Sequence, residues 1–171
     1  QCAGSRDVNH LPYCSAICCL ASMKQAMYVK ERLPETEVTI YYIDRRTPGR
    51  NEEMLNRVEE LDGVELVKGK VGRIEQSGGA LKLRVEDVES GRLLEAEHDL
   101  VVLATGMVSN LEGGDSPFVV TTDGDGFGLD DEAAKLFVAG VARRPEGVAE
   151  SVRDATGASA RACVAATGRT Q

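Results

Sequence analysis

The sequence predicts an α/β fold, in which a parallel sheet is extended by a three-stranded antiparallel meander. One observation is the order strand, helix, strand over residues 37–44, 52–61 and 64–67, because this order gives a parallel pair joined by a crossover. A second is a run of short alternating segments separated by the turns Gly78-Gly79 and Ser90-Gly91, which is typical of hairpins. These segments are residues 71–75, 81–88 and 93–97.

The other elements follow from their apolar patterns. Residues 15–33 are rich in Ala, Leu, Met and Lys and repeat apolar side chains every three to four positions, so they predict a helix that Pro34 ends. Two continuous apolar runs, 100–104 and 136–141, predict strands that are buried on both faces. Residues 148–166 predict a last helix whose many small side chains let it lie close to a backbone or a cofactor.

The composition excludes several classes of function. The chain has 171 residues and a formal net charge of −8, and an acidic chain repels nucleic-acid phosphates. No apolar run approaches the ~18 residues that span a bilayer, and the start does not resemble a signal peptide. We therefore expect a cytoplasmic protein that binds no nucleic acid. Because the chain begins with Gln and not Met, we also expect a piece of a longer protein.

Four of the five cysteines fall within the first 19 residues, at Cys2, Cys14, Cys18 and Cys19. The odd total and the tight clustering argue against a secreted disulfide framework. Near a helix start, Cys14 and Cys18 share one face, Cys19 is turned by about 100° from Cys18, and Cys2 reaches over from a loop. Backbone N–H groups at a helix start favour an anionic group, and four thiolates are the usual ligands of a [4Fe–4S] cluster.

Other interpretations of these cysteines remain open. Zinc also binds four thiolates, although it prefers paired Cys-x2–4-Cys turns, and the cysteines could be plain core residues. A thiol–disulfide pair is less favoured because no Cys-x-x-Cys is present. Cys163, in an Ala-rich helix, is interpreted as a small core residue. His10 and His98 carry no partner pattern, and a role of His10 in tuning a cluster is the less favoured interpretation.

Two further motifs carry weak signals. The stretch Gly124–Gly128 repeats glycine at every second position, but it does not lie between a strand and a helix start, so we interpret it as a loop and not as a phosphate site. Arg143-Arg144-Pro145 either leads into a helix near an anionic cofactor or simply carries solvated charge.

Several segments together carry a resemblance to a known family. They are Cys2–Asp7, Leu11–Ser15, Cys18-Cys19, Tyr41–Arg46, Val101–Met107 and Leu136–Gly140. They resemble the A subunit of heterodisulfide reductase and, equally, the related flavoprotein subunit of the quinone-interacting membrane-bound oxidoreductase of sulfate reducers. The resemblance covers nearly the whole chain.

The resemblance implies a piece of a thioredoxin-reductase-like flavoprotein with an FAD/NAD(P)-binding-like sheet. Residues 1–100 would form the nicotinamide-type domain, with a [4Fe–4S] cluster where a relative keeps its pyridine-nucleotide loop, and residues 101–171 would return to the FAD-type domain. Thr105 and Gly106 match the turn beside the flavin, and Gly140 matches the segment over its ribityl and pyrophosphate side.

The chain departs from that pattern in two ways. It lacks the Gly-x-Gly-x-x-Gly loop that holds an FAD pyrophosphate, so we expect FAD in the full-length protein and not tightly held by this piece. Relatives have Gly-Asp before the last helix, where this chain has Gly140-Val141. A carboxylate contact to the flavin side chain is therefore not expected at this position.

The implied function is that of an oxidoreductase subunit that passes electrons between FAD, the cluster and partner redox subunits. The first interpretation places it between membrane quinones and the adenylylsulfate reductase pathway of sulfate reduction, with a membrane-anchored quinone-reactive partner. The alternatives are heterodisulfide reduction of the methanogenic type, a non-enzymatic module stabilised by zinc, and a pyridine-nucleotide-binding domain. This piece alone would be inactive, and its uncovered apolar faces would favour self-association.

Overall fold

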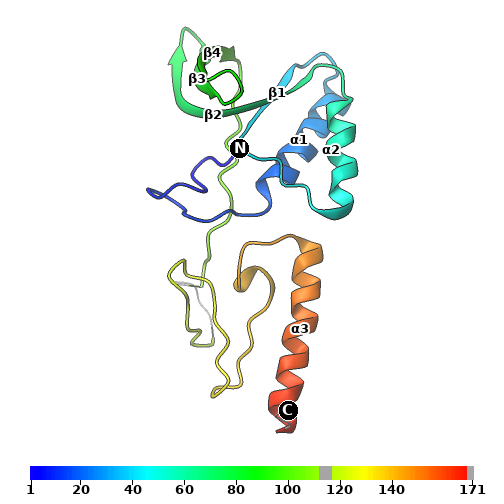
Figure 1. Cartoon of the computed structure of the whole chain (residues 1–171), viewed down its shortest axis with the longest axis vertical. Helices are drawn as coiled ribbons and strands as arrows, with labels where there is room; N and C mark the ends of the chain where they lie inside the picture. The colour runs from blue at the N-terminus through cyan, green and yellow to red at the C-terminus, as the bar shows by residue number, and fades with distance from the viewer. Residues whose placement is uncertain (112–116, 169–171) are drawn as a thin grey trace. The chain divides into compact units, whose positions relative to one another are not determined.

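The computed structural model describes residues 1–111 and 117–168, and the chain divides into two compact units (Figure 1). The first unit contains residues 1–13 and 18–106, and the second contains residues 14–17 and 107–171. The assignment of residues 1–100 to a nicotinamide-type domain and of the remainder to an FAD-type domain stays a prediction.

A four-stranded mixed sheet forms the centre of the first unit and confirms the predicted α/β class. Its strands are β1 (Val38–Tyr42), β2 (Val64–Ser77), β3 (Ala80–Asp87) and β4 (Arg92–His98), in the order β1-β2-β3-β4. β1 and β2 are parallel, with Val38 opposite Val64, and the other two pairs are antiparallel. The crossover between the parallel strands is made by η1 (Gly49–Asn51) and α2 (Glu52–Glu59), as the strand–helix–strand order requires.

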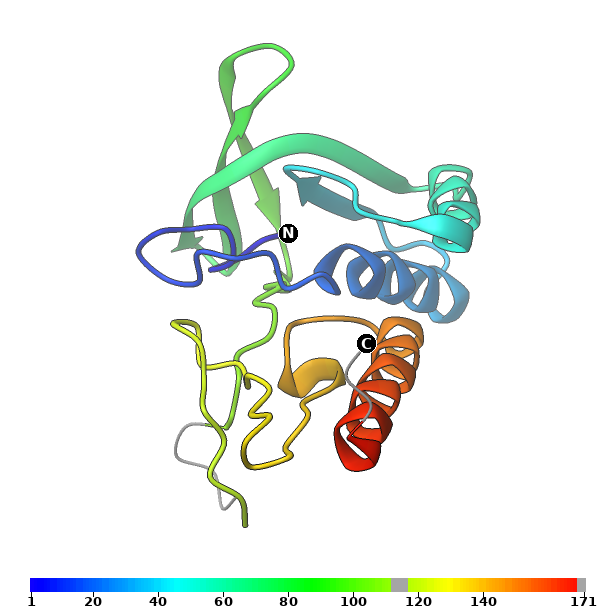
Figure 2. The same cartoon turned by 60° about the horizontal axis from the view of Figure 1, so that its bottom comes forward.

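β2 is longer than predicted because it changes partner along its length. Its first five residues pair with β1, and from Gly69 onward it pairs with β3 (Figure 2). The predicted segments 64–67 and 71–75 are therefore one strand, with an irregularity between Val71 and Arg73. A Cβ atom on Gly69 would lie 2.8 Å from the carbonyl oxygen of Glu86, so only glycine lets β3 approach this closely.

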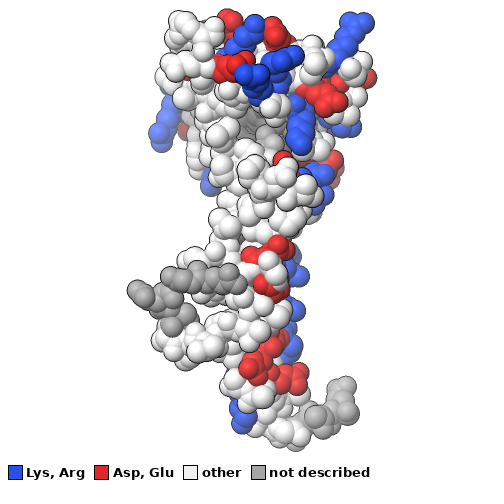
Figure 3. Space-filling view, turned by 90° about the vertical axis from the view of Figure 1, so that its left-hand side faces the viewer, with Lys and Arg blue, Asp and Glu red and all other residues white. Residues whose placement is uncertain are grey.

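The meander buries one face and exposes the other. On β3, Leu83 and Val85 are 2% and 0% exposed, whereas Lys82 on the opposite face forms an ion pair with Glu95 at 2.8 Å. This alternation is the period-two pattern of a half-buried antiparallel sheet. On the face seen in Figure 3, basic and acidic side chains intermingle over the first unit, so no large region carries a single sign of charge.

Helix α1 (Cys18–Arg32) starts three residues later than predicted. Ala16 has a φ of +59°, a left-handed conformation that cannot be part of a right-handed helix. The end of the helix before Pro34 is as predicted. Its buried side chains, Cys18, Cys19, Met23 and Ala26, follow a helical spacing, and α1 contacts α2 beside the sheet.

The predictions of buried strands at 100–104 and 136–141 are wrong. Leu100 and Val102 are 78% and 68% exposed, and neither segment forms a strand among the described residues. A strand needs a neighbour for its N–H and C=O groups, and residues 136–141 have only an isolated bridge from Leu136 to Asp131, followed by η2 (Gly140–Ala142). The apolar composition of the two segments therefore did not indicate whether another strand would pair with them.

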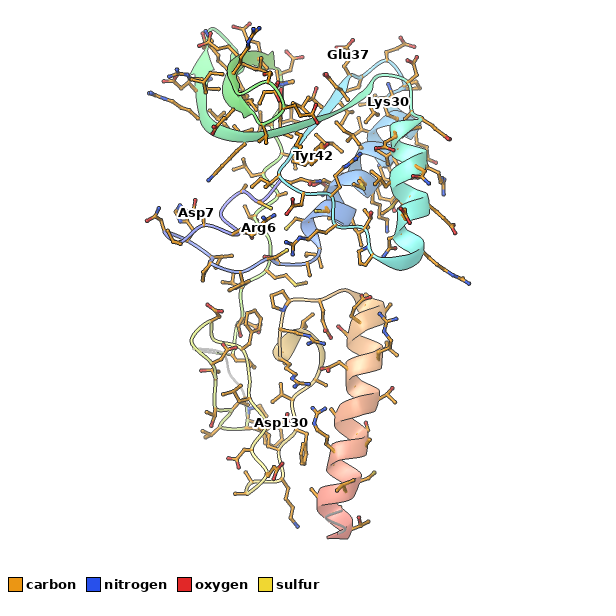
Figure 4. All side chains as sticks on the ribbon, in the orientation of Figure 1. Arg6, Asp7, Lys30, Glu37, Tyr42 and Asp130 are labelled. Carbon is orange, nitrogen blue, oxygen red and sulfur yellow. The ribbon has the colours of Figure 1, made fainter. Side chains whose placement is uncertain are left out.

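The second unit is built from loops against α3 (Val148–Thr167), which was predicted to within one residue. Asp130, labelled in Figure 4, holds these loops to the helix. Its carboxylate accepts hydrogen bonds from the Val138 N–H (2.8 Å) and from Arg161 Nε on α3 (2.9 Å). No helix within residues 1–111 and 117–168 is both long and apolar enough to cross a membrane.

We predict that Leu83→Ala lowers the free energy of unfolding by about 2–5 kcal/mol, because it leaves a cavity in the packed face of the meander. Leu93→Ala on β4 is the matched control, since Leu93 is 66% exposed and its truncation should change stability by about 0.5 kcal/mol at most. Urea unfolding measures both. Equal losses in the two variants would contradict the assigned burial pattern.

Candidate metal centre

The start of α1 and the end of β1 lie at the same edge of the first unit. α1 leads directly into β1 along the chain, and the Cys19 Sγ at the start of the helix donates a hydrogen bond to the main-chain oxygen of Asp44, two residues beyond β1, at 3.4 Å. The carboxyl edge of parallel strands is where α/β proteins commonly bind ligands. The fold therefore places the helix start with its cysteines at that edge.

Three of the predicted ligands belong to the first unit. Cys18 and Cys19 are 9% and 7% exposed, and Cys2 is half-buried. Burial lowers the pKa of the Gln1 ammonium, and this lowering is partly opposed by the charges of Cys2, Cys19 and Cys18, which raise the same pKa. The same ammonium, next to Cys2, donates a hydrogen bond to the Tyr41 oxygen in β1 at 2.6 Å. None of the five cysteines forms a disulfide.

Cys14 is placed differently from the other three. It belongs, with residues 15–17, to the second unit, and its Sγ accepts a hydrogen bond from the Ala16 N–H at 3.4 Å. Its membership in a common ligand set stays a prediction.

The predicted ligands are all thiol groups. In the part of the chain that the structure describes, no three Cys, His, Asp or Glu side chains are arranged around a point that could hold one metal ion. Soft thiolates are the ligands that a [4Fe–4S] cluster requires. Thiol groups in and beside a helix start supply that chemistry.

Three charged residues that the sequence analysis gave no role, Arg6, Asp44 and Arg46, form ion pairs beyond β1. Arg6 Nη1 lies 2.6 Å from Asp44 Oδ2, and Arg46 Nη2 lies 3.6 Å from the same oxygen. The hydrogen bond and charge of Arg6 lower the pKa of Asp44. The pKa of Arg6 is raised, chiefly by its hydrogen bond to Asp44 and in smaller part by the charge of Cys2 and a hydrogen bond to it. Arg6 and Asp44 are 38 residues apart in sequence, so no local pattern reveals their contact.

The predicted flavin-side turn is tied to the loop that carries Cys2. The Ala3 N–H donates to the Ala104 oxygen at 3.1 Å, and the Ser5 hydroxyl donates to the Thr105 oxygen at 3.4 Å. Gly106 has a φ of +92°, which favours glycine. Thr105 and Gly106 therefore lie in a turn that the structure anchors to the cysteine loop.

Gly140 lies in the second unit and is held by a carboxylate. Its φ is +65°, and its N–H donates to Asp154 Oδ2 on α3 at 3.0 Å. Asp154 also pairs with Arg143 at 3.1 Å. The Gly140 hydrogen bond, followed by the charges of Arg143 and Arg144, lowers the pKa of Asp154. In the sequence, Asp154 stands out only as a carboxylate that precedes a run of small residues in α3.

The remaining predictions have clear outcomes. Arg144 forms an ion pair with the buried Glu146 at 2.9 Å, so the two arginines before α3 both contact carboxylates of their own unit. The Gly124–Gly128 stretch is a loop, as predicted, organised by Asp123. His10 is exposed. Cys163 is also exposed, so its prediction as a core residue is wrong; it lies on a part of α3 that the described loops do not cover.

Comparison with known proteins decides the family. No family model matches the chain. It is 35% identical over 96% of its length to the A subunit of the H2:CoB-CoM heterodisulfide,ferredoxin reductase of Methanothermobacter marburgensis. It is also 35% identical over 96% of its length to an iron–sulfur A subunit of the CoB–CoM heterodisulfide reductase of Methanopyrus kandleri. Its identity to the A subunit of the ferredoxin:CoB-CoM heterodisulfide reductase of Methanosarcina acetivorans is 36% over 95% of its length.

The chain belongs to the family of heterodisulfide reductase A subunits. It spans between 22% and 27% of the length of these relatives. The resemblance drawn from the cysteine motif is thereby confirmed, and so is its reach over nearly the whole chain. Two of the relatives carry the words "iron-sulfur subunit" in their names.

We predict that Asp154→Asn destabilises the protein at neutral pH, because the amide keeps at most a neutral hydrogen bond to Gly140 and loses the charge that pairs with Arg143. A carboxyl whose pKa is lowered on folding contributes stability above its unfolded pKa and loses that contribution as the pH falls through its folded pKa. The difference in melting temperature between wild type and variant should therefore shrink on acidification below about pH 4. Glu150→Gln, at an exposed pair on the same helix, is the control, and a pH-independent difference would contradict the assignment.

Proposed function

We propose that the chain is the cluster-bearing part of an electron-transfer subunit of the heterodisulfide reductase type. The observation that carries the proposal is the placing of buried Cys18 and Cys19, and of Gln1 next to Cys2, beside the end of β1, in a chain whose relatives are named as heterodisulfide reductase subunits. A group of buried thiols at a helix start is suited to an anionic metal–thiolate centre.

In this proposal Cys2, Cys14, Cys18 and Cys19 hold a [4Fe–4S] cluster, which when bound accepts and returns one electron. The residues of the chain bind and shield it. The start of α1 directs backbone N–H groups toward negative charge. Burial of Cys18 and Cys19 keeps water from their sulfur atoms, and solvent exposure is one of the factors that set a cluster potential.

FAD is the second cofactor of the proposed subunit. Thr105, Gly106 and Gly140 would contact it through their backbone groups, while its pyrophosphate would be held by a Gly-x-Gly-x-x-Gly loop that this sequence does not contain. The hydrogen bonds from Ala3 and Ser5 to residues 104 and 105 support a direct mechanical link between the flavin-side turn and the cysteine loop. A flavin and a cluster held on one connected loop system would be well placed to exchange electrons.

The relatives favour a heterodisulfide role over the quinone pathway. All three relatives described above are named as heterodisulfide reductase subunits, which supports the interpretation that the sequence analysis placed second. We therefore propose that the full-length protein passes electrons among flavin, cluster and partner redox subunits for reduction of a disulfide between two thiol coenzymes. Electron transfer between membrane quinones and adenylylsulfate reduction has no corresponding support.

The proposal predicts about four irons and four sulfides per chain after preparation or reconstitution without oxygen. Cys2→Ser, Cys18→Ser and Cys19→Ser should each lose most of this iron, because serine is a poor ligand for the cluster. Cys163→Ser is the matched control, since Cys163 is an exposed residue of α3, and it should retain the wild-type content. One tightly bound zinc in place of iron, or iron that is indifferent to these substitutions, would contradict the proposal.

Cys14→Ser tests the fourth ligand separately. Loss of iron equal to that of the other variants would support a four-cysteine set, and full retention would mean that the fourth ligand is another group. The electron paramagnetic resonance spectrum of the reduced cluster, recorded for each variant that retains iron, distinguishes an altered ligand from an unaltered one.

A further inference from the structure

Cys2 lies in a strained stretch of backbone that is held on both sides. Its φ is +56°, a left-handed conformation that residues other than glycine seldom adopt. On one side the Gln1 nitrogen donates a hydrogen bond to the Tyr41 oxygen of β1 at 2.6 Å. On the other side the Ala3 N–H donates to the Ala104 oxygen at 3.1 Å. Such a conformation persists only where its surroundings fix it, so the position of Cys2 depends on these two contacts.

The two segments that hold Cys2 belong to opposite edges of the sheet. β1 is one edge strand, and Ala104 follows the other edge strand, β4. The N-terminus lies beside the segment that follows β4 in both Figure 1 and Figure 2, and Figure 2 shows β2 as one long curved strand. The irregularity of β2 between Val71 and Arg73 is of the kind that bends a strand. A bent β2 allows the two edges of the sheet to approach each other.

A side-chain contact joins the two edges directly. The Tyr41 hydroxyl and His98 Nε2 are 2.9 Å apart, which is a hydrogen-bond distance, and the two rings meet edge to face with their centroids 5.8 Å apart. Burial, and in smaller part the charge of Glu65, raise the pKa of Tyr41, so its hydroxyl keeps its proton at neutral pH. The two residues are 57 positions apart, which explains why the sequence shows no partner for His98.

Tyr41 therefore takes part in both halves of the arrangement. Its main-chain oxygen holds the residue before Cys2, and its hydroxyl holds His98, the last residue of β4. The chain then continues from β4 to Ala104, which holds the residue after Cys2. These contacts close a ring around the cysteine. Without the bond between the two side chains the ring is open, and the two segments that hold Cys2 can separate.

We propose that the hydrogen bond between Tyr41 and His98 positions Cys2 for metal binding, by holding together the two segments that fix the backbone on either side of this cysteine. The inference rests on the proposed function for the role of Cys2 as a ligand. The positioning of Cys2 can be measured without a cluster. Tyr41 and His98 are positioning residues, because they act on the site through the backbone of Cys2.

General stabilisation of the sheet is the competing explanation, since a bond between β1 and β4 also supports the fold. The two roles differ in which thiols they protect. A general loss of stability exposes the buried Cys19 of α1 together with Cys2, whereas a loss of positioning exposes Cys2 alone.

The first experiment measures the rate at which iodoacetamide alkylates Cys2 and Cys19 in the reduced, metal-free chain, by mass spectrometry of peptides. Tyr41→Phe keeps the ring and removes the hydroxyl, so Cys2 should react about fivefold faster, the factor expected for the loss of one hydrogen bond. Cys19 should react at the wild-type rate. Tyr28→Phe, at an exposed tyrosine of α1, is the matched control and should change neither rate. Equal acceleration at both cysteines, or none at Cys2, overturns the inference.

Substitutions of His98 test the same bond from its other end. His98→Leu removes the ring nitrogens and should accelerate Cys2 as Tyr41→Phe does, whereas His98→Gln keeps a group that can bond the hydroxyl and should restore most of the protection. The double variant Tyr41→Phe/His98→Leu should react no faster than either single variant, because both changes remove one bond. Additive effects overturn the inference.

The second experiment follows the release of iron to a chelator from protein that has been loaded with its cluster without oxygen. Tyr41→Phe should release iron faster than wild type by a factor similar to that for Cys2 alkylation, and Tyr28→Phe should not. Release at the wild-type rate from Tyr41→Phe overturns the inference and leaves the proposed function intact. A wild-type protein that binds no iron and sulfide overturns the proposed function, and the alkylation rates then still decide whether the pair positions Cys2.

Discussion

The pairing of β2 with two different neighbours is the constraint on which the first unit depends. Over its first five residues β2 is the parallel partner of β1, and from Gly69 it is the antiparallel partner of β3. The parallel half requires the crossover through η1 and α2, and the start of α1 lies near the end of β1 because α1 leads directly into β1. The antiparallel half supplies a self-contained meander with its own buried face. The helix start with Cys18 and Cys19 lies beside β1, in the parallel half.

In the second unit, side chains and not a neighbouring strand accept the backbone hydrogen bonds of an apolar segment. The apolar run around Val138 has no strand beside it among the described residues, yet its backbone still needs partners. Side-chain carboxylates supply them: the Val138 N–H bonds to Asp130 and the Gly140 N–H bonds to Asp154. Arg161 and Arg143 then pair with the same two carboxylates. Charged side chains therefore hold the loops to α3, whereas in a sheet the backbone hydrogen bonds between strands would do so.

Much of this architecture could be predicted because it is encoded locally. Alternation of apolar and polar residues located the meander, and composition located α3 within one residue. The cysteine spacing indicated both the family and the ligand candidates. The segment 100–104 was wrongly predicted as a strand, because an apolar pattern reports a tendency to be buried and carries no information about a hydrogen-bonding neighbour. The delayed start of α1 depends on the φ of Ala16, which no propensity scale contains.

The contacts that matter most for the candidate site are non-local. Arg6 and Asp44 are 38 residues apart, and each is unremarkable in its own segment. Their meeting follows from the fold-back of the N-terminal loop and from the place where β1 ends. Sequence analysis can name the thiols of such a site, whereas the charges that surround them emerge from the three-dimensional structure.

The left-handed backbone of Arg6 places two opposed demands on one position. The conformation itself costs an ordinary L-residue about 1–2 kcal/mol, and glycine or asparagine would adopt it more readily. Neither of those residues carries a positive charge. A library randomised at this position and sorted by backbone strain alone would therefore enrich glycine and asparagine, whereas the ion pair with Asp44 requires a positive charge. Position 6 is thus a site where the backbone conformation and the side-chain contact favour different residues.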